Sequence, residues 1–551
     1  MDLLDRPRRN EAIANQPPPL VDYDVYASDT ALRAAVAASG AAWAEPALRE
    51  IGARAGSAEA IAWGFDANRN PPVLQTHDRY GRRRDEVEYH PSYHRLMDVA
   101  VGAGLHCSSW AEPREGAHVA RAAAFFVWSQ CEAGHGCPIS MTHAAVPALR
   151  VEPEAAASWL PSIFSRSYDP KLGRRGEKTS ALFGMSMTEK QGGSDVRANT
   201  TSAVSLRGTA REYLLRGHKW FCSAPMCDAF LVLAQAPGGL TCFLVPRVLP
   251  DGTRNAFALQ RLKDKLGNRS NASAEIEFDG TWAERIGDEG RGVATVVEMV
   301  NLTRLDCIIG SASGMRQAVA QAIHHASYRS AFGKLLAEQP LMQNVLADLA
   351  IEAEAATLLF ARLAKACDDA AAGDAGAAAL KRIGTAAGKY WVCKRAALVA
   401  AEALECLGGN GYVEESIMPR LFRESPLNSL WEGAGNVNAL DVLRAFAREP
   451  GVTDAVFAEV EASRGADRRF DRAAARLREE LSDAVDAEFR ARTLVERLAL
   501  VLCGALVLRS GPPAVADAFC ASRFDDAYRG ALGTLPRGTA AAAIVARARA
   551  A

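Results

Sequence analysis

The spacing of apolar residues changes twice along this chain, and this change constrains the fold more than any other feature. From about residue 28 to 160, apolar residues recur every three to four positions, as in "ALRAAVAASGAAWAEPALREI" and "EGAHVARAAAFFVWSQ", which predicts helices. Between about 179 and 287 the apolar runs are short, β-rich and punctuated by Gly, Pro, Asn and Asp, as in "AFLVLAQA" and "LTCFLVPRV", which predicts an antiparallel sandwich or small barrel. Long helical patterns return from about 290 to 449.

At 551 residues the chain exceeds one ordinary domain. We predict an N-terminal extension and helical domain (1–178), a β domain (179–287), a helical bundle (288–449) and an Arg- and Ala-rich C-terminal helical domain (450–551). Within the bundle, the segment "CDDAAAGDAGAAALKR" is predicted to be a connecting loop.

The composition is 49% hydrophobic and 23% charged, as in soluble globular proteins. The formal net charge of −1 gives no global basic excess for nucleic acid, so any such surface must be local. We find no apolar run of about 18 residues, which would indicate a membrane span. The start, "MDLLDRPRRN", lacks a hydrophobic signal core, so we expect a cytoplasmic protein.

Twelve cysteines are scattered without a repeating spacing, which favours reduced, buried thiols. The tightest group is Cys131, His135 and Cys137 in "QCEAGHGCPIS". A structural zinc site needs four ligands, usually as two spaced pairs, and no second pair is present. We therefore predict no metal site, and a tight turn that closes a helix at Gly134–Pro138.

The stretch "FGMSMTEKQGGSDVRANTT" (Phe183 to Thr201) is too polar and too Gly-rich to be core. Its Gly192–Gly193 pair would let the backbone approach a ligand closely, and Thr188 and Ser194 offer hydroxyl and N–H donors. A solvated loop is the alternative interpretation.

Three further stretches accompany it. "GHKWFCSAP" places Trp220, whose indole could stack on a flat ring, and Ser223 on a β segment. "YRSAFGKLLAEQPLMQ" holds Arg329, Phe332 and Gln343, which suit a pyrophosphate and an adenine. "ECLGGNGYVEES" and "SLWEGAGNVNALDVLRAF" supply Gly-rich turns at helix ends. Each also has a structural explanation: a core Trp, an exposed Arg, or a helix C-cap.

Together, in this order and within a helix–β–helix layout, the four motifs resemble the acyl-CoA dehydrogenase family of flavoproteins over about residues 28–448. "MTEKQGGSDVRANTT", "RYGRRRDEVEYHPSYH" and the extension beyond Pro450 are similar to its AidB-like branch, which is linked to the response to DNA alkylation. The resemblance implies the acyl-CoA dehydrogenase fold, mainly α with a central β domain. It also implies FAD as cofactor, an acyl-CoA or related small molecule as substrate, and a homotetramer. No Rossmann G-x-G-x-x-G is apparent, and this family needs none.

The resemblance also implies which residues bind FAD. Thr188 and Ser194 would lie at the isoalloxazine end, Trp220 would flank the ring, and Leu430 to Leu440 would close over the cofactor. Thr188, Ser194 and Arg304 would also meet the substrate. The full FAD-binding set is Met185, Met187, Thr188, Gly192, Gly193, Ser194, Trp220, Ser223, Arg329, Phe332, Gln343, Gly408, Gly409, Gly433 and Asn436.

In this family a carboxylate removes the α-proton of an acyl thioester while the β-hydrogen leaves as hydride to the flavin. Glu432 in "WEGAGN" matches the usual position of that base, which needs its pKa raised by burial; a Glu favoured by a helix dipole is the alternative. One sub-branch carries its base in a segment resembling "NLTRLDCIIG", where this chain has Thr303. Thr303 cannot abstract a carbon-bound proton, so Glu432 is the sole candidate. Arg304 would meet a ligand carboxylate, Glu432 or a helix neighbour.

The last 101 residues hold 15 Arg, no Lys and 14 acidic residues, a net charge of about +1. In "GADRRFDRAAARLREEL", Arg469, Arg472 and Arg476 recur every three to four positions and share one helix face. The apolar residues of that helix, Phe470, Leu477 and Leu481, fall on another face.

Arg444 projects from the polar side of "NVNALDVLRAFARE", opposite Leu440, Leu443 and Phe446, and it matches a basic residue that carries the family's DNA role. Binding through such residues would be nonspecific for double-stranded DNA, because phosphates rather than base edges are contacted. The alternative is a surface helix with weak ion pairs. The Arg82–Arg83–Arg84 triplet would add to a basic surface or cap a loop.

The predicted function is therefore an AidB-like FAD flavoprotein with slow acyl-CoA dehydrogenase-type chemistry and nonspecific DNA binding in the alkylation response. Two alternatives stay open. One is a metabolic dehydrogenase for a short or branched acyl-CoA without a DNA role. The other is a non-catalytic, flavin-stabilised DNA-binding protein.

Overall fold

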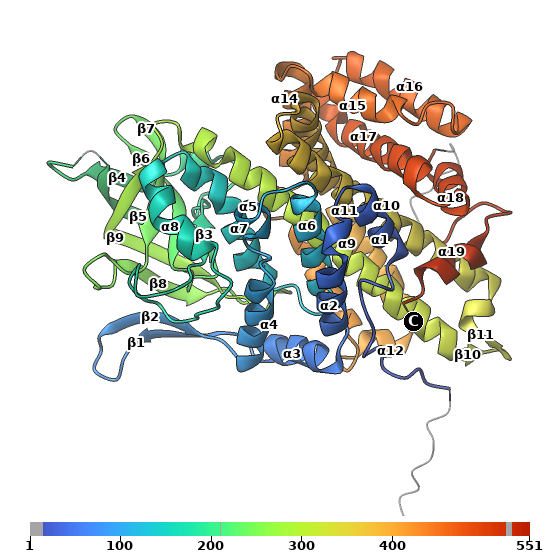
Figure 1. The fold of residues 1–551 in the computed structure, drawn as a ribbon, viewed down its shortest axis with the longest axis horizontal. Helices are drawn as coiled ribbons and strands as arrows, with labels where there is room; N and C mark the ends of the chain where they lie inside the picture. Colours follow the sequence, from blue (N-terminus) through green and yellow to red (C-terminus); the bar gives the residue numbers. More distant parts are fainter. Residues whose placement is uncertain (1–14, 210, 525–531, 551) are drawn as a thin grey trace, which may run out of the picture.

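The computed structural model describes residues 15–209, 211–524 and 532–550. Figure 1 shows a β domain at the left, N-terminal helices beside it, long helices through the middle and C-terminal helices at the upper right. The predicted order of helical, β and helical parts is confirmed, whereas the exact domain boundaries stay predictions.

The N-terminal helices pack with the bundle into one continuous apolar core. They start where the sequence supplies caps: Asp29 accepts a hydrogen bond from the backbone of Leu32, and Ser57 does so from Ala60. The helices are α1 (Thr30–Ala38), α2 (Glu45–Ala55), α3 (Ala58–Arg69), α4 (Pro91–Gly102), α5 (Ser108–Ala111), α6 (Ala117–Trp128), α7 (Gly136–Arg150) and α8 (Pro153–Ile163).

Two local predictions in this region are wrong. A hairpin of β1 (Val73–His77) and β2 (Arg83–Glu88) interrupts the helical block. It forms because it reaches the β domain, where Arg83 donates to the carbonyl oxygen of Leu259 (3.0 Å). The turn near Gly134 opens a helix rather than closing one: α7 starts at Gly136, with Pro138 in its first turn, where a missing N–H is tolerated.

The β domain is a small barrel rather than a purely antiparallel sheet. Its strands follow the order β3-β6-β4-β5-β9-β7, and an additional β6–β7 pairing closes the path. The β3–β6 pair is parallel. The barrel core contains the rings of Phe230, Phe243, Phe257 and Phe278. The strands are β3 (Phe183–Ser186), β4 (Ser202–Ser205), β5 (Glu212–Ser223), β6 (Ala229–Ala236), β7 (Gly239–Pro246), β8 (Phe257–Leu262) and β9 (Ser273–Ile286).

The bundle is built on three long helices, α9 (Gly292–Tyr328), α10 (Pro340–Ala371) and α11 (Ala375–Cys406). The predicted connecting loop is almost entirely helical, because its alanines favour helix. Only residues 372–374 turn, with Gly373 at φ +98° and Asp374 capping α11. The smaller elements are β10 (Ser330–Ala331), β11 (Lys334–Leu335), α12 (Gly409–Tyr412), α13 (Met418–Glu424), η4 (Leu427–Ser429) and α14 (Gly435–Arg448).

The C-terminal helices pack against the bundle and share its core. Arg523 reaches from this region to Asp348 and Glu352 on α10, as a buried ionic contact. These helices are α15 (Val452–Glu461), α16 (Arg468–Ser482), α17 (Ala487–Ser510), α18 (Pro513–Arg523) and α19 (Ala541–Ala548). No helix in the described part of the chain is both long and apolar enough to span a membrane.

Candidate active site

Glu432 lies on a strained turn between η4 and α14. Its φ is +57° and that of Gly433 is +93°. A left-handed backbone is unfavourable for a residue with a β-carbon, so the surroundings must hold it in place. Such strain is typical of functional sites.

Two buried cations hold the carbonyl groups of this turn. Arg304 on α9 donates from Nε to the carbonyl oxygen of Glu432 (2.9 Å), and Lys389 on α11 donates from Nζ to that of Gly433 (2.7 Å). Asp441 on α14 fixes Arg304 in turn, through a 2.7 Å hydrogen bond. The backbone position of Glu432 is therefore set by helices from three places in the sequence.

The Glu432 carboxyl has the electrostatics of a general base. Burial raises its pKa above the ordinary value. Thr303 donates a hydrogen bond to Oε2 (2.8 Å) and, together with the charges of Lys389 and Arg304, limits that rise. A carboxylate with a raised pKa accepts a proton more readily at neutral pH.

The polar, Gly-rich stretch forms an exposed loop after β3. Trp220 donates its backbone N–H to the carbonyl oxygen of Thr188 (2.9 Å), so two of the predicted flavin contacts are adjacent. A β-carbon on Gly193 would lie 2.3 Å from Oγ1 of Thr188, so any larger residue there would have to displace the Thr188 side chain. Gly192, Gly193 and Ser194 are all exposed, whereas Met185 and Met187 pack partly against the core.

Trp220 and Ser223 follow on β5. Nζ of Lys263 lies 3.4 Å from the centroid of the Trp220 ring, so a cation already occupies part of the space around this indole. Ser223 shares a 3.2 Å hydrogen bond with Ser273.

Cys137 connects this strand to Glu432. Burial raises the pKa of the Cys137 thiol to about 12, while Ser223 acts on it through a hydrogen bond and Glu432 through its charge. Groups from both the β domain and the bundle therefore influence the pKa of this thiol.

A second group of predicted FAD contacts lies elsewhere. Arg329 ends α9 and donates to the carbonyl oxygen of Asn15 (2.6 Å), and Phe332 is 99% exposed at the tip of the β10–β11 hairpin. Gln343 donates to the carbonyl oxygen of Ala337 (2.9 Å). Figure 1 shows β10 and β11 at the opposite end of the molecule from β3 and β5. One chain therefore does not bring the two groups together.

The remaining predicted contacts are glycines and one amide. A β-carbon on Gly408 or Gly409 would meet nothing within 4 Å, so both residues border open space. A β-carbon on Gly433 would lie 3.2 Å from Arg304, inside the Glu432 turn. Asn436 is exposed in the first turn of α14.

The segment Cys131–Cys137 ties two parts of the fold together. The Glu132 carboxylate accepts hydrogen bonds from the backbone N–H of Gly134 (2.8 Å), from His135 and from Ser270 (2.8 Å). It thereby ties the start of α7 to the β8–β9 loop. All twelve cysteines are buried thiols, and the described residues contain no cluster of three His, Cys, Asp or Glu side chains suited to a metal.

The predicted basic stripe on α16 is largely paired with acidic side chains. Arg469 contacts both Asp467 (2.6 Å) and Asp517 (2.7 Å), and Arg476 contacts Glu480 (3.0 Å). Phe470 and Leu477 are buried on the opposite face, as predicted, and Arg472 is exposed.

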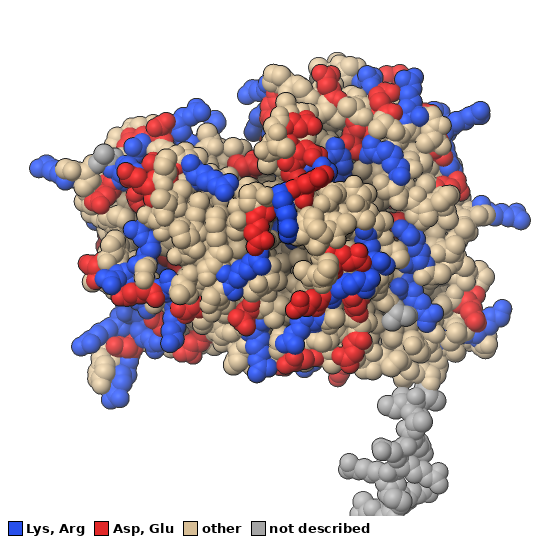
Figure 2. Space-filling view, viewed as in Figure 1, with Lys and Arg blue, Asp and Glu red and all other residues tan. Residues whose placement is uncertain are grey.

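On α14, Arg444 has a side-chain exposure of 61% and lies 3.8 Å from Asp441. Leu440, expected on the apolar side, is 38% exposed. Of the Arg triplet, Arg83 and Arg84 pair with acidic residues of their own strand. Figure 2 shows both charge signs interspersed over this face, including the C-terminal helices.

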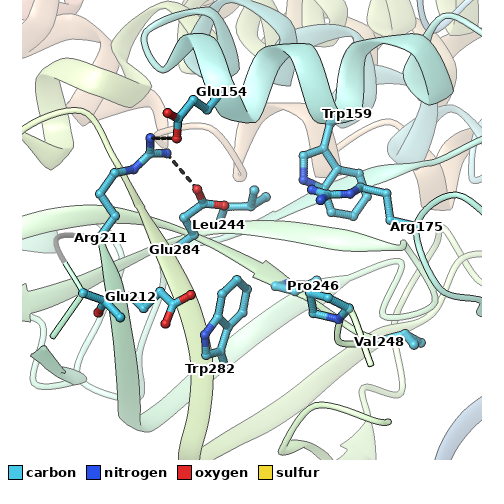
Figure 3. A pocket seen from close by; sticks show the side chains of 12 residues that line it. Glu154, Trp159, Arg175, Arg211, Glu212, Leu244, Pro246, Val248, Trp282 and Glu284 are labelled. Atoms are coloured by element: carbon cyan, nitrogen blue, oxygen red, sulfur yellow. Dashed lines mark hydrogen bonds and ion pairs between the residues drawn. The ribbon is translucent and has the colours of Figure 1, made fainter. Parts of the chain in front are cut away.

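A separate cavity of about 410 Å³ lies between α8 and the barrel (Figure 3). Arg211 crosses it and binds Glu154 (3.0 Å) and Glu284 (2.8 Å), while Trp159 and Trp282 form walls. None of the predicted site residues lines it, so it is distinct from the Glu432 site.

Four residues that support the site were not predicted from the sequence: Glu189, Lys219, Lys389 and Asp441. Each is a charged residue that is buried in the fold. Their sequence surroundings look like those of solvated charges, and only the burial reveals them, because buried charges require partners. Lys219, beside Trp220 in an otherwise strand-like segment, offered the clearest signal.

The residues around the barrel end of the site fit FAD. The hydroxyl groups of Thr188 and Ser194 offer hydrogen bonds, and Trp220 offers a flat apolar face. The side-chain oxygen of Asn438, buried beside the Glu432 turn, has no hydrogen-bond partner among the described residues. Buried polar atoms are normally satisfied, so this atom is available to a bound group.

Comparison with known proteins agrees with this architecture. Residues 15–170 match the model for the adaptive response protein AidB N-terminal domain, residues 184–281 the acyl-CoA dehydrogenase middle domain, and residues 290–447 the acyl-CoA dehydrogenase C-terminal domain. The chain is 47% identical to AidB of Escherichia coli strain K12, which is classed as an acyl-CoA dehydrogenase, over 94% of this chain and 95% of that protein.

Solved structures show the same fold. The Caenorhabditis elegans ACDH-11 structure, in complex with C11-CoA, is 26% identical and superposes with a TM-score of 0.84 over 94% of this chain and 92% of that chain. The Bacillus anthracis acyl-CoA dehydrogenase complexed with FAD is 18% identical and has a TM-score of 0.64, over 78% of this chain and 80% of that chain. FAD is the cofactor of this family. The chain thus belongs to the acyl-CoA dehydrogenase family, in the branch that carries the AidB N-terminal domain.

Proposed function

We propose that this protein binds FAD and an acyl-CoA thioester and oxidises the bond between the α and β carbons of the acyl chain, with Glu432 as the base. The observation that carries the proposal is the Glu432 carboxyl itself, whose pKa burial raises and whose backbone is clamped by Arg304 and Lys389. Family membership supports the reaction class.

The reaction divides between the protein and the cofactor. Glu432 takes the α-proton on a carboxylate oxygen, and the C–H electron pair it leaves behind forms the new double bond. FAD, when bound, accepts the β-hydrogen with its electron pair. Thr303 holds one oxygen of the base and so fixes the direction of the other. Arg304 is already bonded to Glu432 and Asp441, so we assign it to holding the base rather than to binding a substrate carboxylate.

Replacing Glu432 by Gln tests this proposal. The variant should keep its FAD and lose flavin bleaching by a panel of acyl-CoAs, with a rate at least about 10²-fold lower, the usual scale of general-base catalysis. Glu424→Gln is a matched control, because Glu424 is a second partly buried glutamate, hydrogen-bonded to Asn268 instead. Bleaching at the wild-type rate in Glu432→Gln would exclude Glu432 as the base.

We also propose that the protein binds double-stranded DNA nonspecifically in the cytoplasmic response to DNA alkylation, as its similarity to AidB suggests. Exposed Arg444 and Arg472 support this role. On α16, the acidic partners of Arg469 and Arg476 reduce the positive charge that these two residues would offer to DNA. Filter binding against salt tests the proposal: Arg444→Ala and Arg472→Ala together should lower the affinity at low salt and reduce its salt dependence.

The same titration separates the alternatives. No DNA binding at low salt, combined with fast acyl-CoA turnover, would favour a metabolic dehydrogenase for a short or branched acyl group. DNA binding without bleaching by any acyl-CoA would favour a flavin-stabilised scaffold.

We further propose a homotetramer in which two chains complete each FAD site. The β10–β11 hairpin, which carries Phe332 at its tip, lies at the opposite end of the molecule from β3 and β5 (Figure 1), so a neighbouring subunit would have to supply one of the two groups. Phe332 is 99%, Tyr412 81% and Leu341 77% exposed near this end, an apolar surface that favours subunit contact.

Phe332→Ser should lower both the measured mass in light scattering and the FAD occupancy. Monomers that bind FAD normally would contradict this assembly.

A further inference from the structure

A buried ion pair lies at the root of the loop that the proposed function assigns to FAD. Nζ of Lys219 on β5 is 2.8 Å from Oε1 of Glu189, and both side chains are 0% exposed. Taking two charges out of water is costly, and the cost is recovered only when the geometry and the additional hydrogen bonds are good. Such a pair is therefore weak evidence for stability and suggests a role in fixing one conformation.

The Glu189 carboxylate closes the loop by binding both of its ends. It accepts hydrogen bonds from Nε2 of Gln191 (2.9 Å), the backbone N–H of Thr200 (2.7 Å) and the backbone N–H of Thr201 (3.1 Å). Between these ends, residues 190–195 are exposed and contain no apolar anchor. The Glu189 carboxylate therefore fixes both ends of the loop, while Val196 packs against the core and Asn199 donates to the carbonyl oxygen of Met187 (2.9 Å) to hold its second half.

Lys219 connects that carboxylate to the barrel. It also donates to the carbonyl oxygen of Leu233 on β6 (2.7 Å). The next residue, Trp220, donates its backbone N–H to the carbonyl oxygen of Thr188, the residue before Glu189. The Glu189–Lys219 ion pair and this backbone hydrogen bond thus join the same two chain segments. Thr188 and Trp220, two of the predicted flavin contacts, are the residues next to the pair.

Both members of the pair are charged at neutral pH. Burial opposes the negative charge, but the bonds from Gln191, Lys219, Thr200 and Thr201 outweigh it and hold the pKa of Glu189 well below its usual range. Burial lowers the pKa of Lys219 to about 8, against the opposing effect of Glu189.

We propose that Glu189 and Lys219 are positioning residues for FAD: their ion pair sets the distance between Thr188 and Trp220 and so pre-forms the isoalloxazine site. This proposal rests on the proposed function in one respect, namely that the chain binds FAD at this loop. Neither residue needs to touch the cofactor.

A double-mutant cycle on flavin affinity tests the proposal. FAD is titrated into the apoprotein of the wild type, Glu189→Gln, Lys219→Met and the double variant, and unfolding is followed in parallel. Each single variant leaves one buried charge unpaired and should lose both stability and affinity. The double variant removes both charges, so its stability should recover while its FAD dissociation constant stays at least tenfold above wild type. The visible spectrum of the bound flavin should also lose its resolved shoulder.

Lys178→Met is the matched control. Lys178 forms a similar pair with Asp228, also at 2.8 Å and nearly buried, but at the far end of β3 from the loop. The Lys178→Met variant should lose stability without losing affinity for FAD. Lys219→Arg, which keeps the cation, should retain more affinity than Lys219→Met and covers the case in which that variant does not fold.

Two results would count against the inference in distinguishable ways. If affinity recovers together with stability in the double variant, the pair acts on folding alone and does not position the flavin site. If the wild-type apoprotein binds no FAD, the proposed function fails first, and the positioning role fails with it.

Discussion

At the scale of single residues, Glu432 shows how a strained backbone is made to persist. Its positive φ would be unfavourable in isolation. Arg304 and Lys389 donate hydrogen bonds to successive carbonyl oxygens of the turn. Such charge-assisted hydrogen bonds are stronger than neutral ones. The backbone of Glu432 is thus held in one conformation.

Thr303 tunes the base, which gives a pH prediction. Its hydrogen bond to Oε2 lowers the pKa of Glu432 against the larger effect of burial. Thr303→Val keeps the shape and removes the donor, so the pKa of Glu432 should rise further, because a hydrogen bond to the charged carboxylate favours that form. The acid limb of the kcat/KM pH profile should move to higher pH. Thr295→Val, elsewhere on α9, should leave the profile unchanged.

At the scale of elements, α16 shows a helix defined by its cap and one apolar stripe. Asp467 accepts hydrogen bonds from the backbone of Arg469 and Phe470 and also binds the Arg469 side chain. Asp467→Ala should cost about 1 kcal/mol of stability, measured as a lower unfolding midpoint. Glu479→Ala, an exposed change on the same helix, should remain within about 0.5 kcal/mol of wild type. Equal losses in both variants would argue against a capping role.

The β1–β2 hairpin marks the limit of reading elements from sequence. Val87 is the single buried residue in its two strands, so they carry little apolar alternation to distinguish them. Their stability comes from contacts with β8, about 170 residues later in the chain, through Arg83 and Leu259. The long helices of the bundle, in contrast, were predictable because each buries a wide apolar face.

At the scale of the whole molecule, buried histidines couple stability to pH. Burial lowers the pKa of His106 to about 4 and that of His118 to about 3. Between about pH 6.5 and 4, the unfolded chain binds protons at these positions and the folded chain does not. Stability should therefore fall as the pH decreases through this range, by up to about 1.4 kcal/mol for each unit of pKa shift at each site.

Unfolding midpoints measured from pH 7 to pH 4 test this dependence. His118→Gln removes one titrating group and should flatten the profile between about pH 6.5 and pH 5, above the range in which carboxylates of the unfolded chain take up protons. A profile as steep as that of wild type would show that His118 makes no contribution.

The sequence alone predicted the order of helical and β parts and the family, and both are confirmed, because periodicity and motifs are local properties of the chain. The role of Glu432 as the base stays a prediction. The tertiary structure decided which charges are buried and paired. Glu189 and Lys219, or Asp441 and Arg304, are separated along the chain by 30 and 137 residues. Apart from the strand-like surroundings of Lys219, little in the local sequence distinguishes them from solvated charges. It also decided that the predicted FAD contacts fall into two groups at opposite ends of one protomer, because that separation depends on how the barrel and the long helices pack together.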